Sequence, residues 1–149
     1  MKILTMRNET IATAESCTGG LLAHRITNIP GASAVFRAGY VAYANDSKIT
    51  FLGVGARFLR ENGAVSDATA HAMADGARER TNATYALATT GIAGPGGGTG
   101  AKPVGTVYIA LASEHADTLA RQFCFPVDRE TFKQLASQAA LNLLREQLL

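Results

Sequence analysis

The segment Thr13–Gly20 has the sequence Thr-Ala-Glu-Ser-Cys-Thr-Gly-Gly and separates two apolar stretches of the chain. It follows the apolar pair Ile11–Ala12. After it, Leu22 and Ile26 recur at the four-residue spacing of one face of an amphipathic helix. The segment therefore predicts a junction where a buried strand ends and a helix begins. At such a junction the first N–H groups of the helix lack partners within it, and the helix dipole is positive.

The hydroxyl groups of this junction have two interpretations. Ser16 or Thr18 could cap the helix, which is the common role of these residue types. Either could instead do chemistry beside backbone N–H groups that are ready to bind an anion. Gly19 and Gly20 allow another backbone or a ligand to come close. Cys17 is a further candidate nucleophile, because a helix N-terminus lowers a thiol pKa; its alternative role is that of a small buried apolar residue.

Hydrophobic spacing predicts the remaining elements. Strands are expected over residues 9–14, 36–44, 85–90, 104–112 and 119–125, the last two paired as a hairpin. The first helix should end near Pro30, and short helices should contain Lys48 and Phe58. A helix capped by Ser66 should bury small side chains, namely Ala70, Met73, Ala74 and Ala77. The last helix should begin at Asp128 and bury one face, namely Phe132, Leu135, Ala136, Ala139, Leu143 and Leu144.

These elements predict the fold class. Short strands that alternate with helices are typical of an α/β protein. The nearly continuous apolar run at 104–112 suits a strand covered on both faces. We expect one three-layer α/β/α domain over residues 1–149, with a mixed, mostly parallel sheet.

Composition excludes several classes of protein. Of the 149 residues, 47% are hydrophobic and 17% charged, which excludes a disordered chain. The net charge is +2 and the basic residues are scattered, so a nucleic-acid partner is not expected. No apolar run is long enough for a membrane span, and residues 1–6 are too short for a signal peptide. Cys17 and Cys124 form no C-x-x-C motif. We expect a reduced, cytoplasmic protein.

The histidines offer neither a metal site nor a catalytic base. His24, His71 and His115 are far apart in the sequence and form no ligand motif, so no metal is expected. A Ser-His-Asp triad is not expected for the same reason. If Ser16 is a nucleophile, its base must therefore be another residue. Lys48 is the candidate, since Ser-Lys pairs are an established variant; its alternative role is that of a solvated helix residue.

The most glycine-dense stretch is Gly91–Gly100, which follows a predicted strand. It is not a P-loop, because no Gly-Lys-Ser/Thr follows it. It is not a dinucleotide-binding fingerprint either, because Lys102-Pro103 and a strand follow in place of a helix. From the residues alone, it could equally be a long flexible connection.

Several blocks, in the right order, resemble the C-terminal domain of the competence/damage-inducible protein CinA. The blocks are Ala14–Gly20, Val41–Lys48, Gly63–Ser66, Thr90–Pro95 and Lys102–Val107. The resemblance covers the chain from about residue 10 to its end. Stand-alone members of that family are nicotinamide mononucleotide amidohydrolases. The resemblance therefore implies hydrolysis of a carboxamide, with release of ammonia and no metal or organic cofactor.

The resemblance also implies roles for individual residues. Ser16 would be the nucleophile, Lys48 the base, and Tyr43 a hydroxyl that relays or orients the proton. The oxyanion would lie against backbone N–H groups near Thr18 and Gly19. The implied substrate-binding residues are Thr18, Gly19, Ser33, Asn45, Thr90, Gly91, Gly94 and Arg129. Either Lys102 or Arg129 would hold the phosphate.

The chain departs from the family pattern in two places. Val127 occupies a position where the family usually has glycine, which weakens the assignment of Arg129. Most of the helix that usually precedes the first strand is missing.

The expected partner is a small-molecule nucleotide, with no nucleic acid or membrane. We also expect a homo-oligomer, because family members tend to self-associate and the helical faces at 70–77 and 132–144 are apolar. Two other functions are possible. One is a nucleotide-binding module in which Ser16 is only a cap. The other is an interaction protein in competence or DNA damage response.

Overall fold

Five strands form one mixed sheet in the computed structural model, which describes residues 1–149. The strands are β1 (Ile11–Glu15), β2 (Phe36–Val41), β3 (Tyr85–Gly91), β4 (Thr106–Ser113) and β5 (Leu119–Cys124). Their order in the sheet is β2-β1-β3-β4-β5. β1 pairs in parallel with both neighbours, whereas β4 is antiparallel to β3 and to β5. Four strands therefore run in one direction and β4 runs in the other, as expected for a mixed sheet and a β4–β5 hairpin.

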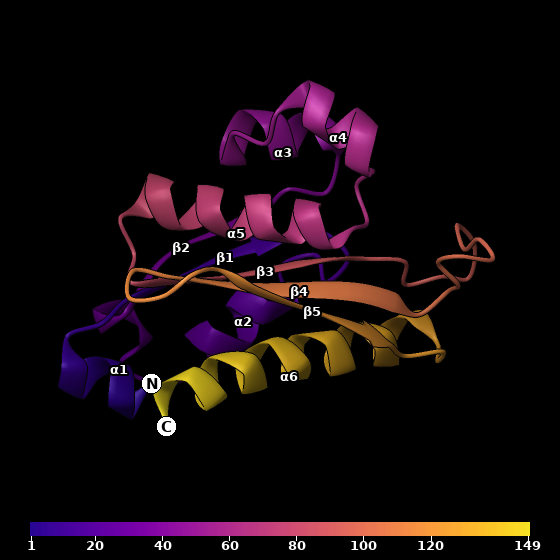
Figure 1. Ribbon diagram of the computed structural model, residues 1–149. Coiled ribbons are helices and arrows are strands. Elements are labelled where there is room, and N and C mark those ends of the chain that lie inside the picture. Colours follow the sequence, from indigo (N-terminus) through magenta and orange to yellow (C-terminus); the bar gives the residue numbers. More distant parts are fainter.

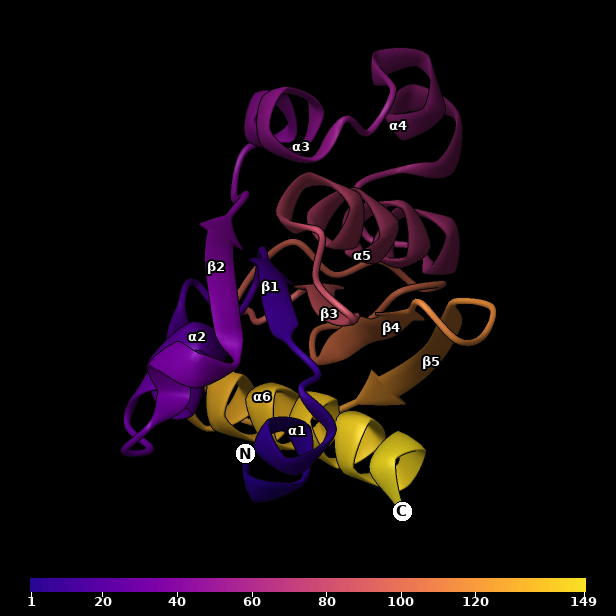
Figure 2. The same cartoon turned by 90° about the vertical axis from the view of Figure 1, so that its left-hand side faces the viewer.

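Helices cover both faces of the sheet (Figure 1). They are α1 (Lys2–Arg7), α2 (Leu21–Thr27), α3 (Asn45–Leu52), α4 (Ala56–Asn62), α5 (Asp67–Thr81) and α6 (Arg129–Leu148), with a short 3₁₀ turn at Ala32–Ala34. α1, α2 and α6 lie on one face and α5 on the other, with α3 and α4 on the outer side of α5 (Figures 1 and 2). The expected three-layer α/β/α arrangement is confirmed.

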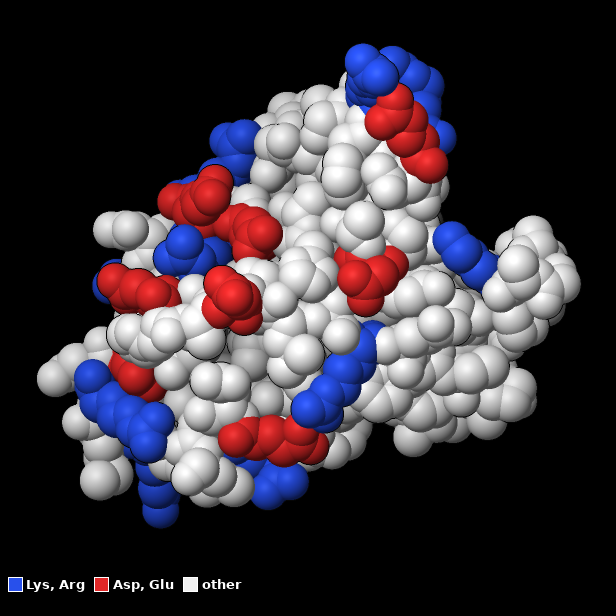
Figure 3. Space-filling model, viewed as in Figure 1, with Lys and Arg blue, Asp and Glu red and all other residues white.

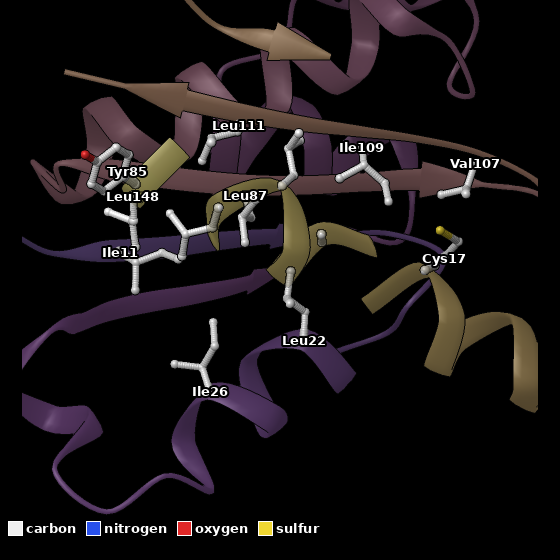
Figure 4. Packing of buried hydrophobic residues seen from close by; sticks show 14 of the residues in the cluster. Ile11, Cys17, Leu22, Ile26, Tyr85, Leu87, Val107, Ile109, Leu111 and Leu148 are labelled. Atoms are coloured by element: carbon white, nitrogen blue, oxygen red, sulfur yellow. The ribbon is translucent and has the colours of Figure 1, made fainter. Parts of the chain in front are cut away.

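The two faces of the sheet are packed with side chains of different size. Successive strand residues point to opposite faces, so Ile11, Leu87 and Ile109 face α2 and α6 (Figure 4). Alanines such as Ala86 and Ala88 alternate with them and face α5. Side chains this small let the backbone of α5 lie close to the sheet. The expected buried face of α5 is confirmed, because Ala70, Met73, Ala74 and Ala77 are all fully buried.

Most of the helix and strand ends predicted from the sequence lie close to the observed ones. The Ser66 hydroxyl caps α5 by accepting from the Thr69 N–H at 3.1 Å, as predicted. One helix was missed and one expectation was wrong. Helix α1 was not anticipated, and Leu135 of α6 is 38% exposed because it lies outside the stripe that contacts the sheet. No helix is both long and apolar enough to pass through a bilayer.

The loop between β3 and β4 projects from the end of the sheet at which α6 begins (Figure 1). It contains most of the glycine-dense stretch. The carboxyl ends of the parallel strands β1 and β3 lie at this same end of the sheet, where α/β proteins usually bind ligands.

Gly76 tests how closely α5 and α3 pack. A Cβ at this position would overlap the backbone carbonyl oxygen of Leu52 and lie 2.9 Å from its carbonyl carbon. Glycine-to-alanine changes in a helix usually stabilise, but here the backbone of α3 would have to move. We expect Gly76→Ala to lower the free energy of unfolding by about 3 kcal/mol. Urea unfolding measures this. The exposed Glu79→Ala on the same helix should stay within about 0.5 kcal/mol of wild type, and an unchanged Gly76→Ala would contradict the close packing.

Candidate functional site

Helix α2 begins against the carboxylate of Glu15, the last residue of β1. Glu15 Oε2 accepts from the N–H groups of Gly20 at 3.0 Å and Leu22 at 2.9 Å, and Oε1 accepts from that of Ala23 at 2.8 Å. The Thr18 hydroxyl donates to the same carboxylate at 2.7 Å. Glu15 is 1% exposed. A negative charge at this position suits the positive end of the helix dipole.

This arrangement corrects the expectation that Ser16 or Thr18 caps the helix. Neither hydroxyl accepts from a helix N–H, and the N-cap residue, Gly20, has no side chain to cap the helix. The helix start is therefore not a vacant anion site, because Glu15 already occupies it. The alternation of side chains along the strand could have predicted this role. Glu15 is four residues after Ile11, so both side chains point to the face that α2 covers.

The turn after Glu15 holds Ser16 at the end of the sheet. The Ser16 N–H donates to the Thr89 carbonyl at 2.9 Å, and the Ser16 carbonyl accepts from the Gly19 N–H at 3.1 Å. Gly19 has a φ of 60°, in the left-handed region that favours glycine. The Gly19 N–H is thus used within the turn, which corrects its expected role as an oxyanion donor. The N–H groups of Cys17 and Thr18 have no acceptor in the chain.

Lys48 on α3 extends its amine to Ser16. Its Nζ lies 3.1 Å from Ser16 Oγ, 2.9 Å from the Ala42 carbonyl and 3.0 Å from the Tyr43 carbonyl. Lys48 is 1% exposed, and burial lowers its pKa below the ordinary 10.5. No carboxylate pairs with it. Lys48 is therefore a buried residue in contact with the serine, not a solvated helix residue.

Cys17 is not a plausible nucleophile. Burial raises the pKa of its thiol to about 12, so the thiolate is scarce near neutral pH. The side chain belongs to the apolar core that faces α2 and α6, as Figure 4 shows. The interpretation of Cys17 as a small buried residue is confirmed.

A cavity of about 310 Å³ opens beside Ser16 and Lys48. All three catalytic candidates line it, namely Ser16, Tyr43 and Lys48. Five of the expected binding residues line it too, namely Asn45, Thr90, Gly91, Gly94 and Arg129. They come from the ends of β1 and β3, from the connection between β2 and α3, from α3, from the glycine-rich loop and from the first turn of α6. None of the residues around the cavity is an aspartate or glutamate.

Three expected binding residues lie elsewhere. The Thr18 side chain is fully buried between Glu15 and Thr89. Gly19 does not line the cavity. Ser33 lies in the 3₁₀ turn before β2 and lines a separate hollow with Pro30 and Phe36. Because that turn precedes a parallel strand, it is at the opposite end of the sheet from Ser16.

Arg129 closes one side of the cavity. One guanidinium nitrogen donates to the Gly94 carbonyl at 2.8 Å and the other to the Tyr43 hydroxyl at 2.7 Å. Tyr43 is 57% exposed, and its hydroxyl makes no hydrogen bond to Ser16 or Lys48. Its backbone carbonyl, not its hydroxyl, contacts Lys48. The relay role expected for the Tyr43 hydroxyl stays a prediction.

Of the two cations that the sequence left open for a phosphate, only Arg129 lines the cavity. Lys102 instead donates to the Val65 carbonyl at 2.6 Å. Thr90 is similarly engaged, since its hydroxyl donates to the Ala64 carbonyl at 2.6 Å. Both contacts tie the segment before α5 to the edge of the cavity.

A serine in contact with a buried lysine, at the carboxyl ends of parallel strands, defines an α/β protein with a candidate serine–lysine site. The chain belongs to the CinA C-terminal domain family, whose model matches residues 1–148. A CinA-like protein of Chloroherpeton thalassium is 51% identical over 99% of this chain and 36% of its own length. One of Geotalea daltonii is 54% identical over 94% of this chain and 34% of its own length. The chain thus spans about a third of the curated relatives it matches.

Solved structures have the same fold. The competence/damage inducible protein CihA of Agrobacterium tumefaciens superposes with a TM-score of 0.94 at 42% identity, over 97% of this chain and 88% of its own. The competence damage-inducible protein A of Klebsiella pneumoniae has a TM-score of 0.94 at 35% identity, over 99% of this chain and 91% of its own.

Replacing Glu15 tests the junction. In Glu15→Gln one oxygen becomes an NH₂ group that faces backbone N–H donors, so buried donors lose their acceptor. We expect the free energy of unfolding to fall by roughly 2–4 kcal/mol. Urea unfolding gives the value, and Glu79→Gln is the matched control because it makes the same chemical change at an exposed carboxylate and should change stability by less than about 0.5 kcal/mol. Equal stability of the two variants would show that the carboxylate does not hold the junction.

Proposed function

We propose that the chain hydrolyses the carboxamide of nicotinamide mononucleotide to nicotinate mononucleotide and ammonia. The observation that carries the proposal is the contact between the Ser16 hydroxyl and the buried Lys48 amine at 3.1 Å. Family membership adds the substrate class through the sequence resemblance. The names of the relatives state competence or damage induction and no substrate.

The surroundings of Lys48 suit a base. A protonated amine has three donors and no lone pair, whereas a neutral amine has two N–H groups and one lone pair. The two N–H groups can stay on the carbonyls of Ala42 and Tyr43 while the lone pair accepts from the Ser16 hydroxyl. Burial without a carboxylate favours this neutral form.

In the proposed mechanism, Ser16 Oγ attacks the amide carbon while its proton moves to Lys48 Nζ. The tetrahedral intermediate collapses, and Nζ returns the proton to the departing nitrogen, which leaves as ammonia. Water then adds to the acyl-enzyme with the same base taking its proton. Cleavage of the ester restores Ser16 and releases the carboxylic acid.

The oxyanion needs donors beside Ser16. The free N–H group of Cys17 is the candidate, since Cys17 directly follows Ser16, lines the cavity and makes no backbone hydrogen bond through this N–H. Donors of this kind contribute roughly 3–4 kcal/mol each to transition-state stabilisation. The Gly19 N–H cannot serve without breaking the turn.

Self-association stays a prediction of the family resemblance. The apolar face of α5 no longer supports it, because that face is buried against the sheet. A role in binding DNA gains no support from Figure 3, where basic and acidic side chains are interspersed on the face shown.

Single and double variants test the proposed pair. Ser16→Ala and Lys48→Met should each lower kcat for ammonia release by at least about a thousandfold, and the double variant should be little worse than either single, because the two groups act as a unit. Lys2→Met is the matched control, as Lys2 is exposed on α1 and does not line the cavity. Mononucleotide binding, measured by calorimetry, should persist in both singles.

The outcomes separate the candidate functions. Near-normal turnover by folded Ser16→Ala would refute the nucleophile. Loss in Ser16→Ala with full activity in Lys48→Met would keep the nucleophile and discard the base. Binding of the mononucleotide by wild type without ammonia release would favour a nucleotide-binding module.

The lowered pKa of Lys48 predicts a pH dependence. Only the neutral amine is a base, so kcat/KM should rise with pH up to the folded-state pKa, below 10.5, and then level off. Because the unfolded chain binds this proton more tightly, stability should also rise with pH between the folded-state pKa and 10.5. Rate profiles and urea unfolding measure both. Lys48→Met should lack this stability slope; a flat wild-type rate profile between pH 6 and about 10 would exclude Lys48 as the base.

A further inference from the structure

A second hollow of about 390 Å³ adjoins the cavity beside Ser16. It is lined by Leu21, Arg129, Glu130, Lys133 and Gln134, and it shares Arg129 with that cavity. The cavity itself, at about 310 Å³, is near the lower end of small-molecule sites, which span about 300–1,000 Å³. A ligand with a group beyond its reacting ring would therefore extend past Arg129 into the second hollow.

Lys133 carries a positive charge into this hollow. Its Nζ lies 3.7 Å from the position that a Cβ on Gly19 would take, which places the ammonium beside the turn that holds Ser16. Lys133 is half-buried, and no carboxylate forms an ion pair with it. Sequence reasoning missed this residue, because one lysine on an amphipathic helix has no distinguishing pattern.

Arg129 adds a second cation with no acidic partner. Its two hydrogen bonds go to the Gly94 carbonyl and the Tyr43 hydroxyl, which are both neutral. Arg129 and Lys133 are four residues apart on α6 and so lie on the same face of the helix. Two of the N–H groups at the start of α6, those of Glu130 and Thr131, already donate to the Asp128 carboxylate. The two side chains, and not the helix terminus, are the anion-binding groups.

We propose that the second hollow binds the phosphate of the substrate, with Lys133 as a specificity-determining residue beside Arg129. This inference rests on the proposed function, since it assigns one part of that substrate. Glu130 is the opposing charge: its carboxylate lines the same hollow and forms no ion pair with either cation. Glu130 therefore weakens anion binding here, and removing it should have the opposite effect to removing Lys133.

Steady-state kinetics with two substrates tests the inference. Lys133→Met should raise KM for nicotinamide mononucleotide roughly tenfold, which corresponds to about 1.4 kcal/mol, and leave kcat nearly unchanged. Glu130→Gln should lower KM about twofold to threefold, a change expected of a partly screened charge. Neither change should alter kcat/KM for nicotinamide riboside, which lacks the phosphate. Lys2→Gln on α1, an exposed lysine outside both hollows, is the control for net charge.

The dependence of KM on ionic strength is an independent test, because dissolved salt screens interactions between exposed charges. The KM difference between wild type and Lys133→Met should shrink as ionic strength rises. An unchanged KM in Lys133→Met would overturn the inference, and so would an equal loss with the riboside, which would indicate a structural role.

Failure of the proposed function would look different. Wild type would then release no ammonia from either substrate. Calorimetric titration with the mononucleotide would still test the second hollow. Weaker binding to Lys133→Met than to wild type would support phosphate binding there. Equal binding to the two proteins, or no binding to wild type, would overturn the inference.

Discussion

The carboxylate of Glu15 at the start of α2 is the interaction on which the junction depends. It replaces the missing partners of three helix N–H groups and fixes the Thr18 hydroxyl. Thr18 in turn accepts from the Thr89 hydroxyl at 2.7 Å, so the turn is bound to β3 as well as to β1. With both ends of the turn fixed, the Ser16 side chain faces the cavity and the first N–H groups of α2 are occupied.

This internal anion changes the electrostatics of the site. A vacant helix N-terminus would attract an anionic substrate, but here Glu15 already compensates it. The remaining positive groups around the cavity are side chains: Lys48, in contact with Ser16, and Arg129. Lys48 contacts two carbonyl oxygens and the Ser16 hydroxyl but no carboxylate, so burial is not offset by a counter-charge, and its pKa falls. Under the proposed function, anion attraction and base chemistry would therefore belong to different residues.

The layer above the sheet places that lysine. Alanines on one face of β3 and β4 let α5 pack close to the strands, and Gly76 lets α3 pack close to α5. Lys48 lies on α3, which immediately follows β2. Parallel pairing of β1 with β2 brings the ends of both strands together, so the start of α3 is beside Ser16. Core packing therefore sets the distance between Ser16 and Lys48.

The sequence by itself determined the layers and much of the site. Hydrophobic period, turn residues and the Ser66 cap are local signals, and they predicted the sheet, the hairpin and α5. The motif resemblance identified the family and the pairing of Ser16 with Lys48. Tertiary structure alone decided which charged side chains lie at the candidate site. Nothing in the sequence motif distinguishes Glu15 from other acidic residues. Its three N–H partners follow from the sheet face to which it points and from the position of α2 on that face. Ser33 and Lys102 were separated from the cavity, and Lys133 was brought beside it, because such distances depend on how distant elements pack, which local pattern does not encode.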